Sequence, residues 1–387
     1  MQIQKEYKIN TDITLKLENG ITNIYLNGKK FIQCSHIMVS SSLNDFSETK
    51  IDSIDDLEQF HNEFQGEVDL DPMEEFWGHC SNIQAWVENG FDSRLLHSNL
   101  SFPLLKELSN VNPRKYDVIF REEICQRMIE GNYKTLMFLY EEGYVDRLTR
   151  EEFWSVFDFN VRPLMEIERK INENSEESVY FEYNRDAEIV GKILPGTRGK
   201  NSAGFLMDNK CIISVSFFEI DSLDDAILPF ILEKLQAYPS IDALEISGCK
   251  KIHKIPKEIA GLKNLKWLYL ENNNIISLPK KVHQLKKLEE LRLEKNNLTT
   301  LPIGFSYLDS LKYLDLSDNS IEVLDEKIFN LKKIDIIFLR NNLISKIPQD
   351  FANLKTLSRI DLRGNTLNKN KAFYILKKIQ KLKNIQQ

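Results

Sequence analysis

The chain has 387 residues, of which 42% are hydrophobic and 28% charged, and its formal net charge at pH 7 is -7. This composition is ordinary for a soluble globular protein with room for two or three domains. No apolar run approaches the roughly 20 residues of a membrane span, and the polar start MQIQKEYKIN does not resemble a signal peptide. The five cysteines include no C-x-x-C pair, so we expect reduced thiols, a cytoplasmic location and no membrane.

Charge divides the chain into two unlike halves. Residues 1–200 hold 22 basic and 36 acidic side chains, whereas residues 201–387 hold 29 basic and 22 acidic ones. An intramolecular contact between the acidic N-terminal half and the basic repeat-containing half is therefore one expectation. Screening beyond about 10 Å makes solubility the simpler explanation. The acidic total disfavours nucleic acid as a partner, although residues 369–383 are rich in lysine.

The N-terminal residues 1–60 are predicted to form a small β-hairpin module. Apolar side chains alternate with polar ones over residues 13–17 and recur over residues 21–26. The Asn27-Gly28 step that follows is the strongest short hairpin signal known. We therefore expect a small antiparallel sheet at the start of the chain.

A helical domain is predicted for residues 61–165, followed by a linker over residues 166–202. Apolar side chains recur at helical spacing from residue 72 to about residue 157. Thr149 and the acidic residues after it are typical of a helix N-terminus. The polar stretch that begins near Asn172 and contains several glycines favours a linker.

Two residue pairs in this half have the chemistry of a reactive or metal-binding site. His79 and Cys80 are adjacent, but neighbours on a helix point about 100° apart, and the tryptophans beside them indicate a packed core. Cys34 and His36 offer two metal ligands, but the sequence has no second pair at zinc spacing. We therefore predict no catalytic residue, no cofactor and no metal site. An enzyme located in residues 1–165 is kept as the third functional hypothesis.

Five copies of one 23-residue unit run from Leu262 to Leu367. The unit reads L-x-x-L-x-x-L-x-L-x-x-N-x-L-x-x-L-P-x-x-Φ-x-x, and its L-x-L pair predicts a short strand with one face inward. Its asparagine turns the chain and can bond backbone groups of adjacent coils. The asparagines are Asn273, Asn296, Asn319, Asn342 and Asn365. One unit cannot bury its apolar face alone, so the copies must stack into a solenoid.

This spelling is that of a leucine-rich repeat, and the repeat domain is predicted over residues 203–387. A hairpin arm at residues 204–210 and a helix at residues 227–235 begin the array, and a lysine-rich helix over residues 372–385 caps its end. The predicted fold class is an α/β leucine-rich repeat solenoid, a C-terminal horseshoe with a parallel concave sheet, preceded by an α+β N-terminal region.

Side chains that alternate with the core leucines of each strand are expected to point out of the concave face. Their columns place aromatic and arginine side chains together in the middle of the array, and these types are enriched in protein-interface hot spots. Acidic residues gather toward the start of the columns and basic residues toward the end, which can orient a partner. The predicted partner-binding residues are Trp267, Tyr269, Arg292, Tyr313, Asp315, Ile336, Phe338, Arg340, Arg359 and Arg363.

The repeats resemble the intracellular Ras-group class, the 23-residue L-P type found in Shoc2-like scaffolds and Ras suppressor proteins. The resemblance covers residues 241–367 and implies a cytoplasmic adaptor, often one that acts on small GTPases or phosphatases. In the N-terminal half, F-W-G-H-C-S-N-I-Q-A-W and R-L-L-H-S-N-L are similar to segments of uncharacterised archaeal proteins that carry such a module before repeats.

The sequence thus predicts a non-enzymatic scaffold of signal transduction that binds a partner protein on the concave face. A regulator of a small GTPase or phosphatase signalling complex is the alternative. Two other interpretations of the aromatic side chains stay open: they pack only against one another along the ladder, or they contact the N-terminal half of the same chain.

Overall fold

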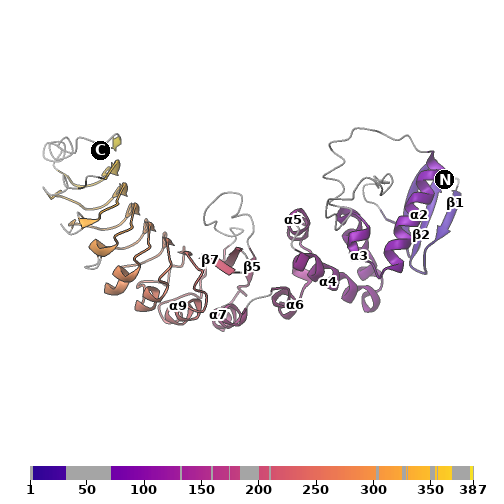
Figure 1. Ribbon diagram of the computed structural model, residues 1–387, viewed down its shortest axis with the longest axis horizontal. Helices are drawn as coiled ribbons and strands as arrows, with labels where there is room; N and C mark the ends of the chain where they lie inside the picture. The colour runs from indigo at the N-terminus through magenta and orange to yellow at the C-terminus, as the bar shows by residue number, and fades with distance from the viewer. Residues whose placement is uncertain are drawn as a thin grey trace, which may run out of the picture. The chain divides into compact units, whose positions relative to one another are not determined.

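The computed structural model describes residues 3–31, 71–130, 133–157, 160–173, 175–183, 200–208, 211–301, 305–324, 328, 330–348, 354, 356–367 and 384–386. The chain divides into two compact units, residues 1–158 and residues 159–387 (Figure 1). Within the described ranges, none of the helices has the length and apolar character needed to cross a membrane. The Cys34 and His36 pair lies outside them.

The first unit begins with an antiparallel sheet, four-stranded among the described residues. Its order is β1 (Ile3–Lys8), β2 (Ile13–Glu18), β3 (Ile21–Leu26) and β4 (Lys29–Lys30). Asn27 and Gly28 have φ of 48° and 80°, the conformation of a two-residue hairpin turn. The predicted hairpin is confirmed. Strand β1 is an addition, because its segment I-Q-K-E-Y-K lacks a strong apolar alternation.

Helices make up the rest of the first unit. They are α2 (Pro72–Glu88), α3 (Ser98–Val111), α4 (Pro113–Glu130), α5 (Tyr133–Glu141) and α6 (Arg150–Ser155), with 3-10 turns η2 (Ser93–Leu95) and η3 (Val145–Arg147). The predicted N-cap of α6 is present, since the Thr149 hydroxyl accepts a hydrogen bond from the Glu152 backbone N–H at 3.2 Å. Helix α2 packs on β2 and β3, so the sheet and the helices belong to one compact unit.

The second unit starts at residue 159, inside the predicted helical domain, and it includes the segment for which the sequence predicts a linker. Helix α7 (Arg162–Asn172) and strand β5 (Phe181–Tyr183) belong to it. Leu164, Ile167 and Ile171 form a fully buried stripe on α7, which packs on helix α9 (Leu228–Leu235). The polar composition of this segment conceals the stripe, because only one residue in three or four needs to be apolar.

The second unit is built on one sheet, which has ten strands among the described residues. Strand β5 pairs with β6 (Ser202–Asp208), which runs antiparallel to β7 (Cys211–Phe218); all other neighbours pair in parallel. The order then continues through β8 (Ala243–Ser247), β9 (Trp267–Tyr269), β10 (Glu290–Arg292), β11 (Tyr313–Asp315), β12 (Ile336–Phe338), β13 (Arg359–Asp361) and β14 (Asn384–Gln386). The predicted hairpin arm and first helix are confirmed as β6–β7 and α9.

The C-terminal cap differs from its prediction where it can be compared. Residues 372–383 of the predicted helix lie outside the described ranges. Residues 384 and 385, its expected end, instead belong to β14, which pairs in parallel with β13. Strand β14 thus supplies hydrogen-bond partners to the backbone groups at this edge of β13. Without it, the edge would be left unpaired and exposed.

The described repeats place their strands on one side of the array, and the helical turns that the structure describes lie on the other. The turns include η4 (Lys257–Gly261), η5 (Lys280–Gln284) and η6 (Phe305–Tyr307). Figure 1 shows the strands along the inner, concave side of the curved array and the helical turns along its outer side. In the three-residue strands β9 to β13 the middle residue is a leucine or an isoleucine that is fully buried in the core between the two sides, as Leu291 is in β10.

Buried asparagines join each coil to the coil before it. Asn296 is 5% exposed, and its Nδ2 donates to the carbonyl oxygens of Leu270 and Leu293 at 2.8 and 3.1 Å. Its Oδ1 accepts from the backbone N–H of Ile275 at 2.9 Å. The same three bonds recur at Asn273, Asn319, Asn342 and Asn365. The predicted role of the asparagines is confirmed.

Candidate functional site

Strand pairing places the concave side chains in straight columns. One column is Ser214, Ala243, Trp267, Glu290, Tyr313, Ile336 and Arg359. The next is Ser216, Glu245, Tyr269, Arg292, Asp315, Phe338 and Asp361. Each parallel pair of these strands is matched residue to residue without a register shift. Equivalent residues of successive strands therefore lie side by side on the sheet. These two columns, which were derived from the sequence, are confirmed.

Aromatic rings and guanidinium groups alternate along the middle of this face. We call Tyr269, Arg292, Tyr313, Phe338 and Arg359 the aromatic–arginine ladder. The Arg292 guanidinium carbon lies 4.6 Å from the ring centroid of Tyr269 and 5.4 Å from that of Tyr313. The Tyr313 and Phe338 rings meet edge to face at 5.6 Å, and Arg359 lies 5.0 Å from the Phe338 centroid. Each contact joins neighbouring strands and holds both side chains in place.

The ladder is less exposed than free side chains on a solvated sheet would be. Tyr269 is only 7% exposed, while Trp267, Tyr313, Ile336 and Phe338 are half-buried. Tyr269, Tyr313 and Phe338 pack sideways within the ladder, in agreement with one of the two interpretations that the sequence leaves open. The half-buried ones nevertheless keep part of their surface accessible, so the face offers apolar area in a fixed arrangement.

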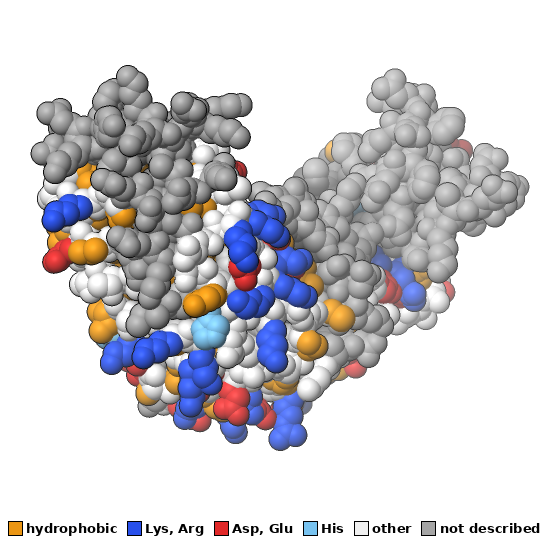
Figure 2. All heavy atoms as spheres, turned by 60° about the vertical axis from the view of Figure 1, so that its left-hand side comes forward, with side chains coloured by type: hydrophobic (Ala, Val, Ile, Leu, Met, Phe, Trp, Pro, Cys, Tyr) orange, Lys and Arg blue, Asp and Glu red, His pale blue; other side chains and the backbone are white. Residues whose placement is uncertain are grey.

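Ion pairs fix several charges beside the ladder. Arg292 Nε donates to the Glu290 carboxylate at 2.7 Å. Asp361 is 4% exposed and accepts hydrogen bonds from the backbone N–H of Arg363 at 3.0 Å and from its guanidinium group at 2.5 to 3.1 Å. Burial alone pushes the pKa of Asp361 up, but the hydrogen bonds and charge of Arg363 outweigh it, so the pKa lies below its ordinary value. Arg340 is exposed, and Figure 2 shows lysine and arginine side chains spread over the repeat domain.

A second feature of this face is a cavity of about 230 Å³ near the start of the array. We call it the acidic pocket. Burial raises the pKa of Glu271 to about 6, and the nearby charge of Glu245 adds to the effect. Burial and the charges of Asp315 and Glu271 raise the pKa of Glu294 to about 7. The pocket is lined by Phe218, Glu245, Ser247, Glu271, Asn272, Glu294 and Lys295.

The acidic pocket was not among the predicted site residues. Its signal in the sequence is the recurrence of glutamate at one repeat position, at Glu271 and Glu294. That recurrence indicates that two carboxylates are neighbours across adjacent coils, about 4.8 Å apart along the sheet. It does not indicate that Phe218 and Ser247, from earlier strands, close the cavity around them.

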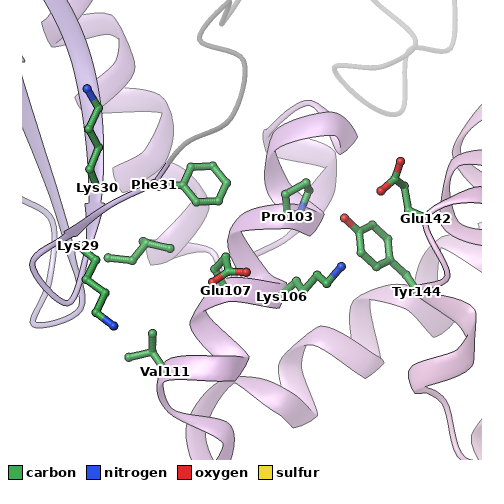
Figure 3. Close-up of a pocket in the computed structure, with 10 residues that line it drawn as sticks. Lys29, Lys30, Phe31, Pro103, Lys106, Glu107, Val111, Glu142 and Tyr144 are labelled. Carbon is green, nitrogen blue, oxygen red and sulfur yellow. The ribbon is translucent and has the colours of Figure 1, made fainter.

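The first unit has a cavity of its own, of about 330 Å³. Figure 3 shows Phe31, Pro103 and Tyr144 around it, with lysines on both sides. The ammonium nitrogen of Lys106 lies 5.2 Å from the Tyr144 ring centroid. The described lining contains lysines, glutamates and a tyrosine, but no histidine, cysteine or serine that could serve as a nucleophile with its base.

His79 and Cys80 lie in the core of the first unit and away from this cavity lining. Each is 2% exposed. Burial lowers the pKa of His79 and raises that of Cys80 to about 11, so the thiol stays protonated at neutral pH. The interpretation of this pair as packed core residues is confirmed.

The comparisons with known proteins agree with the repeat architecture. Residues 239–298, 263–321 and 309–367 match the leucine rich repeat family. Together with the fold and the asparagine bonds, this match shows that residues 239–367 form a leucine-rich repeat array. Arrays of this class generally bind other proteins and are typically not enzymes. Among curated proteins, none matches the chain.

Two solved structures illustrate the similarity. A leucine-rich repeat protein of Leptospira interrogans is 32% identical over 40% of this chain and 38% of its own, with a TM-score of 0.37. The plant peptide hormone receptor RGFR1 in complex with RGF2 is 21% identical over 48% of this chain and 27% of its own, with a TM-score of 0.36. The chain thus matches well under half the length of either structure.

Proposed function

We propose that this protein is a non-enzymatic cytoplasmic scaffold whose repeat domain binds a partner protein on the concave face. The observation that carries the proposal is the aromatic–arginine ladder, whose side chains contact one another across strands β9 to β13. Its rings and guanidinium groups hold one another, so they lose little conformational freedom when a partner covers them. Tyrosine, tryptophan and arginine in such packed settings supply most of the binding energy of protein interfaces.

A regulator of a small GTPase or phosphatase complex is the alternative form of this proposal. The L-P form of the repeats, as in Leu301-Pro302, supports the Ras-group class that implies it. Both forms use the same face, but they differ in whether binding depends on the state of the partner. Equal capture of a bound GTPase in its GDP and GTP-analogue forms would favour the plain scaffold.

The proposal is tested by removing two large side chains from the concave face. Trp267→Ala with Phe338→Ala is expected to weaken partner capture from the native cytoplasm strongly, since a hot-spot residue contributes about 2 kcal/mol, or about thirtyfold in Kd. The control is Tyr307→Ala, which removes a ring that is 59% exposed in η6, on the outer side. Unchanged capture by the double variant, with the fold intact by circular dichroism, would reject the concave site.

A further inference from the structure

The acidic pocket is assembled by four successive strands. Phe218 comes from the end of β7, Ser247 from the end of β8, and Glu271 and Glu294 from just after β9 and β10. Its volume of about 230 Å³ lies below the range of about 300–1,000 Å³ that is typical of small-molecule and cofactor sites. The cavity therefore suits one inserted side chain better than a cofactor.

Hydrogen-bond acceptors in this pocket lack donors. The Oε2 atoms of Glu271 and Glu294 are buried and have no hydrogen-bond partner in the described part of the chain. Ser247 is only 1% exposed, and its Oγ has no partner among those residues either. Buried polar atoms of folded proteins are nearly always paired. Three such atoms around one cavity indicate that a group rich in donors belongs there.

The basic side chains near the pocket form no ion pair with Glu271 or Glu294 in the described part of the chain. The Arg292 guanidinium pairs with Glu290 and lies over the Tyr269 ring, so its contacts are made in the ladder. Lys295 lies at the pocket edge with an exposed side chain, and none of the ion pairs between described residues joins it to Glu271 or Glu294. The pocket thus keeps an excess of negative charge.

We propose that the acidic pocket binds the guanidinium group of an arginine side chain of the partner protein. This inference rests on the proposed function, which supplies the partner. A guanidinium has five N–H donors and no acceptor, which suits carboxylates and a hydroxyl. It also stacks on aromatic rings, here that of Phe218, and it is more weakly hydrated than an ammonium group, so its transfer into the pocket costs less than that of lysine.

A metal ion is a poorer occupant of the pocket. No three histidine, cysteine, aspartate or glutamate side chains among the described residues are arranged to hold one. The ring of Phe218 also offers nothing to a metal ion, whereas it offers a stacking surface to arginine.

The pocket is tested without the partner by titrating the full chain with capped tripeptides. The probes are acetyl-Gly-Arg-Gly-amide, the lysine analogue, the citrulline analogue (a neutral isostere of arginine) and spermidine. Amide shifts of Gly248 and Asn272, beside the pocket, report binding. We expect the arginine peptide to bind at least about tenfold more tightly than the citrulline peptide, and more tightly than the lysine peptide. Equal binding of arginine and citrulline, or tighter binding of spermidine, would overturn the assignment.

Variants locate the binding. Glu271→Gln with Glu294→Gln keeps the shape of both side chains and is expected to reduce arginine-peptide affinity at least about tenfold. Ser247→Ala is expected to reduce it several-fold, by loss of one charge-assisted hydrogen bond. The matched control is Glu322→Gln, an exposed glutamate outside the strands, with no expected change. Unaltered affinity in the Glu271/Glu294 variant would contradict the proposal.

Partner capture separates this inference from the function on which it rests. If both hold, the Glu271/Glu294 variant and the Trp267/Phe338 variant both lose the partner. If the arginine peptide fails to bind while only the Trp267/Phe338 variant loses the partner, the pocket assignment is wrong and the concave site stands. If the peptide binds while both variants capture normally, the partner does not use the concave face, and the assignment of the arginine to the partner fails with it.

Discussion

The carboxyl groups of Glu271 and Glu294 are partly buried. Their burial links the stability of the repeat domain to pH. Burial raises their pKa values from an ordinary 4.5 to about 6 and about 7. The charged groups that face them are Glu245, Arg292 and Asp315. The folded chain therefore binds these protons more tightly than the unfolded chain. The resulting stability is fully present below about pH 4.5 and is lost as the pH rises through 6 and 7.

Substitution of Glu294 makes this linkage measurable. We expect the unfolding temperature of the native chain to fall, relative to that of Glu294→Gln, as the pH is raised from about 5 to about 8, because glutamine cannot ionise. Scanning calorimetry at several pH values measures the difference, and Glu322→Gln, which alters an exposed glutamate, serves as the control. Parallel curves for the native chain and Glu294→Gln would show that Glu294 titrates normally.

Strands β9 to β13 are three residues long each, so strand pairing alone gives each coil few hydrogen bonds. The asparagine of each repeat adds three more, as Asn296 does, and the two carbonyl groups to which Asn296 donates also accept from the asparagines of the adjacent coils. Stability in a solenoid is a sum of coils and of their contacts with neighbours. The asparagines are therefore coupling elements between coils as well as turn residues.

Removal of one coupling asparagine is expected to destabilise the array. Asn296→Ala leaves the Ile275 N–H without its acceptor and removes one of the two asparagine donors from each of the Leu270 and Leu293 carbonyls. An unsatisfied buried group costs about 1–3 kcal/mol, and each lost hydrogen bond adds to that. We expect a loss of about 3 kcal/mol in the free energy of unfolding, measured by urea denaturation. The adjacent, exposed Asn297 provides the control, since Asn297→Ala should change stability by less than about 0.5 kcal/mol. Equal stability of the two variants would contradict the coupling role.

Elements with a strict period were predictable, and elements without one were not. The 23-residue spacing fixes the strands and their register, because a shift by one residue would turn every leucine out of the core. Helix α7 escaped prediction because its buried stripe of Leu164, Ile167 and Ile171 is surrounded by charged residues. The pairing of β5 with β6 joins residues about twenty positions apart, a contact that no local pattern contains.

For the whole molecule, the sequence predicts the fold class better than the site. Framework leucines and asparagines specify the solenoid, but they are shared by arrays with unrelated ligands. The concave columns follow from the same spacing, and the structure confirms them. The burial of Tyr269 and the closure of the acidic pocket depend on contacts between side chains of several coils. Such contacts cannot be predicted from the spacing of the repeats.

Hydrogen exchange of the full chain, with and without its captured partner, tests the concave site most directly. A partner seated on that face excludes water from the concave strands and from the residues that directly follow them. We predict slower exchange in the partner complex over residues 267–272, 290–295, 313–318 and 336–341, with little change in η4 to η6. Slowing confined to the outer turns, or to residues 71–157 of the first unit, would contradict the account.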